Sequence, residues 1–185
     1  MSEFSDSYYL FGETQQDGIA LLHRALKYGF VFPEQNNWVT ILPRSTEMIP
    51  SKLMIWANTG TLLHMSYAED FGWYFSIYEG SRRVCHFEYY WLEEAVYDHE
   101  YFDRSKVMEL IERNGSLIAK ASATDITRVL YPNSLDDVMD NSPAYKFAEK
   151  LGLPHYSWLS YKYVKKNFEA YKEKYPGLKR VIGLL

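Results

Sequence analysis

The fold is decided by residues 62–90, which read LLHMSYAEDFGWYFSIYEGSRRVCHFEYY. Aromatic and β-branched residues, which favour strands, fill three runs of this stretch. Turn-forming residues separate the runs at Glu69–Gly72 and at Glu79–Arg82. The stretch therefore predicts three consecutive antiparallel strands joined by two tight turns, and these strands form the centre of a sheet.

Outward from this stretch, the pattern of the chain predicts an α+β fold with a mostly antiparallel sheet. We expect strands near residues 8–11, 30–32, 38–42, 62–68, 73–79 and 83–89. Apolar residues at helical spacing predict helices near residues 14–28, 104–113, 143–151 and 157–174. Because no repeat or linker interrupts the pattern, we expect residues 1–185 to form a single domain, with a basic helical C-terminal part at 143–185.

Local signals set several boundaries. Thr14 and Asp17 have the spacing of a capping box at the start of the first helix. Gly29 is placed to end that helix in a left-handed conformation. Residues 51–57 suit either a short helix or a strand, and residues 91–103 read as irregular.

The composition is that of a globular protein, with 47% apolar and 24% charged residues. It is also rich in aromatic residues, chiefly Tyr, which suits half-buried sites and contact surfaces. Cys85 is the single cysteine, which excludes an internal disulfide and a cysteine-based metal site. The chain begins without a secretory signal and has no apolar run long enough to cross a membrane, so we expect a cytoplasmic protein without membrane contact.

Charge is spread unevenly along the chain. Residues 143–185 carry nine Lys or Arg and three acids, so this segment has a charge of +6. Because the whole chain has a charge of −4, residues 1–142 carry −10. An acidic body with a basic end can bind itself, a second copy as a homodimer, or an anionic partner.

Two histidines and a carboxylate meet on one face of the predicted meander. With a four-residue first loop and a two-residue second loop, His64, His86 and Glu88 share a face with Trp73 and Phe75. Two imidazoles and a carboxylate suit zinc or iron, and they also suit acid–base chemistry. Against shared metal ligation, the two histidines lie two strands apart, roughly 9–10 Å.

The first turn carries two further catalytic candidates, Glu69 and Asp70. A carboxylate pair at the end of a sheet can be presented to a substrate by the loop. Asp also stabilises turns by bonding its own backbone, and Gly72 supplies a positive φ. We favour the structural role for both acids.

Residues 88–103 alternate acids with aromatic rings, which is the most distinctive surface pattern of the chain. Such a surface can hold a basic partner by charge and by cation–π contact. The residues that we expect to bind a partner are Trp91, Glu93, Glu94, Tyr97, Asp98 and Glu100. The alternative is that this segment docks the basic C-terminal helices of the same chain.

Residues 147–159 have the outline of a DNA-binding helix-turn-helix, with Gly152 in the turn. Three lysines of the following helix could contact phosphates. Pro154 in the turn and the bulky Trp158 oppose this interpretation, as does the acidic body of the protein. We therefore do not expect nucleic-acid binding.

The leading hypothesis is a small binding protein that presents an acidic aromatic surface to a protein partner, as an inhibitor or toxin-neutralising protein does. It rests on residues 88–103 and on the lack of phosphate-binding, nucleophile-elbow or HExxH patterns. The first alternative is an enzyme with a His64–His86–Glu88 acid–base or metal site and a pocket on that face. The second is a nucleic-acid-binding regulator acting through the C-terminal helices. We predict no cofactor and no resident metal.

Overall fold

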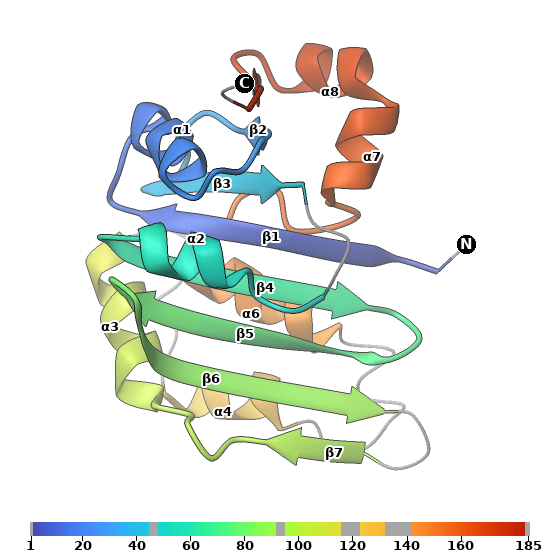
Figure 1. Ribbon diagram of the computed structural model, residues 1–185. Coiled ribbons are helices and arrows are strands. Elements are labelled where there is room, and N and C mark those ends of the chain that lie inside the picture. The colour runs from blue at the N-terminus through green and yellow to red at the C-terminus, as the bar shows by residue number, and fades with distance from the viewer. Residues whose placement is uncertain (1, 45–47, 92–94, 116–122, 132–141, 184–185) are drawn as a thin grey trace.

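One antiparallel sheet of eight strands runs through the part of the chain that the structure, a computed structural model, describes: residues 2–44, 48–91, 95–115, 123–131 and 142–183 (Figure 1). The strand order is β7-β6-β5-β4-β1-β3-β2-β8. The strands are β1 (Phe4–Phe11), β2 (Gly29–Val31), β3 (Trp38–Pro43), β4 (Thr61–Ala68), β5 (Gly72–Glu79), β6 (Arg82–Trp91), β7 (Ala95–Asp98) and β8 (Lys179–Val181). The helices are α1 (Gln15–Arg24), α2 (Lys52–Ala57), α3 (Arg104–Asn114), α4 (Ala123–Leu130), α6 (Pro143–Leu151), α7 (Tyr161–Lys166) and α8 (Phe168–Lys174). The predicted α+β class with an antiparallel sheet is confirmed.

The predicted meander is present, because β4, β5 and β6 are consecutive antiparallel neighbours. Its first connection differs in length from the prediction, whereas the second is the predicted two-residue loop, here Gly80 and Ser81. Ala68 pairs with Gly72, so three residues instead of four form the first loop. A bulge between Ile77 and Tyr78 then shifts the pairing of β5 with β6.

The facing predicted for β5 is therefore wrong. Because side chains alternate along a strand, a one-residue slip turns each of them to the other face, and Trp73 and Phe75 lie on the face away from His86. The bulge shifts the pairing of β5 with β6 by one further residue, so the side chains of β6 return to the predicted faces. As a result His64 and His86 do share a face, as predicted, and each pairs with Ser76.

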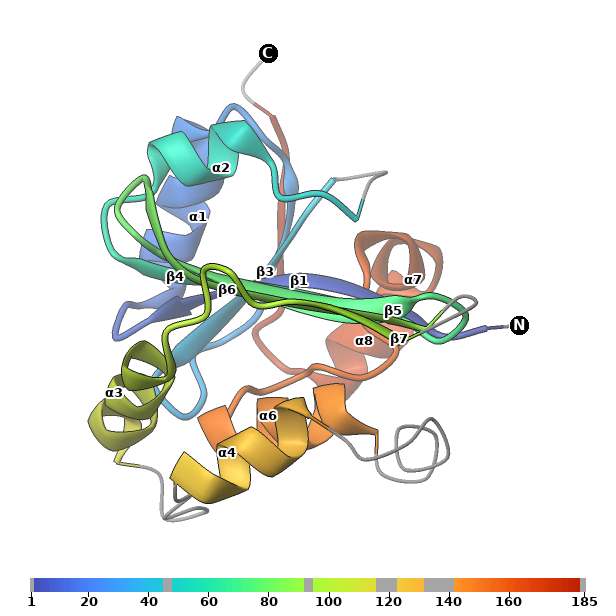
Figure 2. The same cartoon turned by 90° about the horizontal axis from the view of Figure 1, so that it is seen from below.

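One face of the sheet packs against α3, α4 and α6, which lie below it in Figure 2. Phe147 of α6 stacks on Phe75 with ring centroids 4.2 Å apart and lies 5.6 Å from Trp73. At the other end of the same face, Phe30 of β2 stacks on Phe168 of α8. Burial of these large rings supplies much of the hydrophobic stabilisation of the fold.

The opposite face is covered over only part of its width. Leu21 and Leu22 of α1 and Met54 of α2 pack with Tyr8 and Leu62 on the strands below them. Among the described residues no helix continues this layer over β6, β7 and most of β5, and Figure 1 looks directly onto that uncovered end. Polar side chains on this end of the sheet therefore face outward.

Two details at the start of the fold follow from backbone sterics. The capping box at Thr14 is formed as predicted. The helix α1 ends before Gly29, and Leu26, with φ 53°, is the left-handed residue that turns the chain. Gly29 instead lies in β2, where a Cβ atom would be 2.1 Å from the carbonyl oxygen of Leu42. Glycine is needed there for the close approach of two strands, not to end the helix.

The structure also settles one ambiguous segment and corrects the prediction for two others. The ambiguous segment 51–57 forms the helix α2. Residues 91–103, predicted as irregular, contain the strand β7, which pairs with β6. The single helix predicted at 157–174 is two helices, α7 and α8, which meet at Asn167.

Candidate functional site

A groove lies on the uncovered end of the sheet. Its volume is about 500 Å³, within the range of ligand pockets. Its walls come from the loop before α2 and from the turn between β4 and β5, and its floor comes from β5, β6 and β7. The lining residues are Met48, Ile49, Pro50, Phe71, Tyr74, Ser76, Arg83, His86, Glu88, Tyr90 and Asp98.

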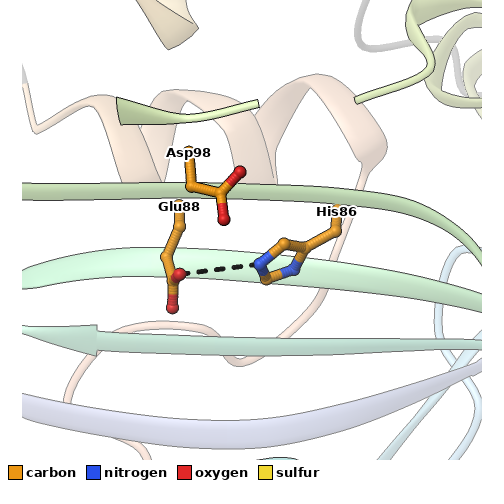
Figure 3. A group of neighbouring side chains, drawn as sticks. All are labelled: His86, Glu88 and Asp98. Atoms are coloured by element: carbon orange, nitrogen blue, oxygen red, sulfur yellow. Dashed lines mark ion pairs between the residues drawn. The ribbon is translucent and has the colours of Figure 1, made fainter. Parts of the chain in front are cut away.

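His86 lies in the floor of the groove, with only 8% of its surface exposed. Its Nδ1 atom lies 3.1 Å from the carbonyl oxygen of Phe75 and 2.8 Å from Oγ of Ser76. Because a carbonyl oxygen can only accept, we infer from the contact with Phe75 that Nδ1 carries a proton. In the neutral ring Nε2 is then the acceptor, and it faces Oε2 of Glu88 at 3.6 Å (Figure 3).

Glu88 and Asp98 lie directly opposite each other across β6 and β7. Both carboxylates accept hydrogen bonds: Glu88 accepts from the hydroxyl of Tyr90, and Asp98 Oδ1 accepts from the backbone N–H of Glu100 at 3.1 Å. The neighbouring His86, and then Tyr90, lower the pKa of Glu88. One potential ligand atom from each of His86, Glu88 and Asp98 lies within 4.8 Å of the other two (Figure 3). Strand pairing therefore gathers three chemically suitable groups at one point.

The groups at this point are hydrogen-bond acceptors. With its Nδ1 proton engaged, His86 offers the lone pair of Nε2, and Glu88 and Asp98 offer carboxylate oxygens. Among the described lining residues Arg83 is the cation, and its guanidinium lies over the ring of Tyr101, 5.0 Å from the centroid. The floor is thus suited to a positively charged group that carries donors, or to a metal cation.

His64 lies on the same face of the sheet but is fully buried beside the groove. Its Nε2 atom lies 2.6 Å from Oδ1 of Asp6, and its Nδ1 atom lies 3.2 Å from the hydroxyl of Tyr74. Its ring stacks on Tyr8 with centroids 4.2 Å apart. Both nitrogens are engaged, so the structure brings His86 and Glu88 together and places His64 in a separate network.

Tyr74 joins this buried network to the groove, because its side chain lines the groove while its hydroxyl contacts His64. Burial, and then the nearby charge of Asp6, raises the pKa of the Tyr74 phenol, which stays protonated. When neutral His64 donates from Nε2 to Asp6, its Nδ1 atom accepts from Tyr74.

The loop that forms one wall of the groove is fixed to the sheet through Tyr8. The hydroxyl of Tyr8 accepts a hydrogen bond of 2.7 Å from the backbone N–H of Ser51. This bond holds the loop just before α2, where Met48, Ile49 and Pro50 line the groove. The side chain of Ile49 is 69% exposed, so the rim carries an apolar group that projects into solvent.

Glu69 and Asp70 lie at the turn between β4 and β5 and do not line the groove. The Oε2 atom of Glu69 accepts a hydrogen bond of 2.8 Å from the backbone N–H of Glu3, and its carbonyl accepts from Nε1 of Trp91. These bonds tie the turn to both neighbouring strands. Their geometry is consistent with the structural role that we favoured for the turn.

The acidic aromatic segment divides between the two faces of the sheet. Trp91 is 7% exposed, and Tyr97 stacks on Tyr89 with centroids 4.4 Å apart, so these rings belong to the core above α4 and α6. Asp98 instead lines the groove, and Glu100 beside it is exposed. Glu93 and Glu94 lie outside the described residues.

The alternative role of this segment is docking within the chain, against the basic C-terminal part at 143–185. Trp91 and Tyr97 share a hydrophobic core with α6 of that part, whereas α7 packs on β2, next to β8 at the opposite edge of the sheet (Figure 1). The helix-turn-helix outline fails, because residues 152–160 separate α6 from α7. A turn in that motif has only about 3–4 residues.

Several residues of the site were missed from the sequence. Tyr90 follows Glu88 by two positions, and alternation along the strand was a sufficient signal to place them on one face. Tyr74 and Ser76 were assigned to the wrong face because of the register slip. Asp6 was missed because β1 begins at Phe4, before the predicted strand.

Comparisons of the chain with protein-family models, with curated proteins and with solved structures found no match. None of the helices in the described part of the chain combines the length and the apolar character that crossing a membrane requires.

Proposed function

We propose that this protein binds a protein partner by taking a cationic side chain of that partner, an Arg or a Lys, into the groove over β5–β7. Such a protein acts by occupying the surface of its partner, in the manner of an inhibitor or a toxin-neutralising protein. The observation that carries the proposal is the acceptor-only set formed by His86, Glu88 and Asp98 at the groove floor.

An Arg or Lys side chain matches this floor in charge and in hydrogen bonding. Ammonium and guanidinium groups only donate, and charge-assisted bonds to carboxylates are the stronger class of hydrogen bond. A partner that covered the groove floor without an ammonium or guanidinium group would remove water from His86, Glu88 and Asp98 and leave these acceptors without donors. This loss of hydrogen bonds costs free energy. The acidic body of the chain, with −10 over residues 1–142, would also steer a basic partner toward it.

The rim of the groove supplies apolar contact around the charged floor. Ile49 and Phe71 line the groove, and 69% and 51% of their respective surfaces are exposed. Exposed large apolar side chains beside a cavity are typical of surfaces that bind proteins. The partner surface we propose is therefore a basic residue flanked by apolar residues.

Peptide binding tests the proposal before the partner itself is identified. An array of peptides with a central Arg or Lys between apolar residues is compared with the same array carrying neutral citrulline or norleucine. We expect binding only of the charged set, and loss of that binding on replacing Asp98 and Glu100 by Lys. The matched control, Glu34→Lys with Glu112→Lys, makes the same change of net charge at exposed positions outside the groove lining.

A pull-down with the same variants extends the test to whole proteins. The wild type and the control should recover a shared partner that the groove variant, Asp98→Lys with Glu100→Lys, does not recover. If the groove variant and the control recover the same partners and bind the same peptides, the proposal is wrong.

An acid–base enzyme is the second candidate, and the orientation of His86 favours it. Its Nδ1 proton is fixed by Phe75, as in catalytic imidazoles, so that Nε2 can take a proton from a substrate beside Glu88. This function predicts turnover of a small substrate that His86→Gln abolishes while binding is kept. If His86→Gln turned over such a substrate as fast as the wild type does, His86 would be excluded as the acid–base group.

A further inference from the structure

We propose that His86, Glu88 and Asp98 form a binding site for one divalent transition-metal ion, for which Zn²⁺ is the best match. The inference concerns the same three acceptors as the proposed partner contact, so a metal ion and a cationic side chain would compete for them. It does not depend on partner binding, because a metal ion can be measured on the protein alone. It also replaces the set of ligands considered from the sequence, since Asp98 takes the place of His64.

The donor set is appropriate for zinc. Imidazole nitrogen and carboxylate oxygen are common zinc ligands, and three protein ligands with one open position are typical of accessible zinc sites. The ligand atoms of His86, Glu88 and Asp98 lie within 4.8 Å of one another. In a tetrahedral site with metal–ligand bonds of about 2.0–2.1 Å, ligand atoms are about 3.3 Å apart. Closing the set therefore requires a contraction of roughly 1.5 Å.

The side chains can make this contraction without moving the backbone. Glu88 is partly exposed and Asp98 is exposed, so both carboxylates can rotate toward a shared ion. Their backbones are fixed as a directly opposed pair of β6 and β7, and His86 lies two residues before Glu88 on the same face. The sheet thus holds the three ligands at the positions from which they converge.

Each proposed ligand is oriented by a neighbour through an atom that the metal does not need. The Nδ1 proton of His86 bonds the carbonyl of Phe75, which leaves Nε2 free for the metal. Glu88 accepts from Tyr90, and Asp98 accepts from the N–H of Glu100. A hydrogen bond from the second nitrogen of a ligating histidine is the usual support of metal sites.

His86 supplies a second, independent indication of a ligand. Its side chain is buried, with 8% of the residue exposed, and Nε2 has no hydrogen-bond donor among the described residues. The nearest group is the carboxylate of Glu88, another acceptor, at 3.6 Å. In the neutral ring protonated at Nδ1, these are two facing acceptors, and either a second proton on His86 or a metal cation in the gap stabilises the arrangement. The groove leaves a position beside this gap for water or for a substrate atom.

Isothermal titration calorimetry of Zn²⁺ into chelator-treated protein without a His tag tests the site. We expect one ion per chain, with a rise in melting temperature on saturation because the ion binds the folded state. The Asp98→Asn variant should bind at least about tenfold more weakly, and it should keep the fold because the side chain is exposed. The His86→Gln variant should also lose binding.

His99→Gln is the matched control, because it removes an exposed imidazole close to the site. It should bind Zn²⁺ as the wild type does, within about twofold, which is far less than the loss expected on removing a ligand. The absence of saturable one-to-one binding overturns the proposal, and so does unchanged affinity in Asp98→Asn. Because no partner or peptide is used, this result is separate from the outcome for the proposed function.

Discussion

His64 and His86 lie on the two strands that flank β5, and both pair with Ser76 on the same face of the sheet. Their surroundings are nonetheless opposite. His64 has a nitrogen on Asp6 and a nitrogen on Tyr74 and is fully buried. His86 has one nitrogen engaged and the other facing the groove. We therefore expect His64 to matter for stability and His86 for binding.

Replacement of Asp6 by Asn tests the structural role of His64. The change keeps the size of the side chain but removes the charge that accepts from His64 at 2.6 Å. A hydrogen bond to a charged group contributes about 1.5–3 kcal/mol, so we expect a loss of that order in the free energy of unfolding. Urea unfolding measures it, with exposed Glu34→Gln as control. An unchanged midpoint in Asp6→Asn would show that the pair does not stabilise the fold.

Replacement of Tyr8 by Phe tests whether that hydroxyl holds the wall of the groove. The variant loses the acceptor of the Ser51 N–H, while the stacked position beside His64 is kept. We expect a cost of about 1 kcal/mol and faster local opening of the loop before α2. Amide hydrogen exchange at Met48, Ile49 and Ser51 is the measurement. Equal protection in wild type and variant would mean that the loop is held by other contacts.

Replacement of Gly72 by Ala tests the register that positions the floor. Gly72 has φ 147°, and a Cβ there would lie 2.2 Å from the carbonyl oxygen of Tyr89. We expect a loss of at least about 3 kcal/mol, because both strain and a backbone clash oppose the change. Gly12, with φ 70° and open space around it, is the control, for which Ala should cost about 1–2 kcal/mol. Equal losses at the two positions would contradict the register.

His155 predicts a pH dependence of stability. Burial, and then the charge of Lys174, lowers the pKa of His155 to about 4. Between that value and the ordinary pKa of about 6.5, the unfolded chain binds a proton that the folded chain does not. Stability should therefore fall as the pH decreases from about 6.5 to about 4, by roughly 1–2 kcal/mol once partial exposure is allowed for.

The variant His155→Asn isolates this effect. Asn tolerates the left-handed backbone of this position, φ 56°, and does not titrate. Melting temperatures of both proteins between pH 4 and pH 7 give the comparison. As the pH falls, we expect the melting temperature of the wild type to decrease more than that of His155→Asn. A constant difference across this range would exclude a contribution from His155.

Much of the fold was readable because local signals and the hydrophobic pattern agree. The turn residues between 62 and 90 specify two reversals, and Thr14 specifies the start of α1. The facing of β5 was not readable, since it depends on a single residue in the first loop. The bulge next to Ile77 then cancels the slip, so that His64 and His86 were placed on one face despite both errors.

The site was readable only in part, for a different reason. His86 and Glu88 could be paired because they are two apart on one strand. Asp98 could not be joined to them, because β7 is a short edge strand of four residues in a segment that the sequence predicts as irregular. The location of the groove depends on where α1 and α2 stop covering the sheet, which is a tertiary property.

The central claim is that the floor of the groove presents acceptors to a cation, and it depends on the proton of His86. Long-range nitrogen–hydrogen NMR of the imidazole, recorded on metal-free protein at a pH where the ring is neutral, measures the tautomer directly. We predict an unprotonated Nε2 atom and a protonated Nδ1 atom in His86. A proton on Nε2, donated toward Glu88, would contradict the account.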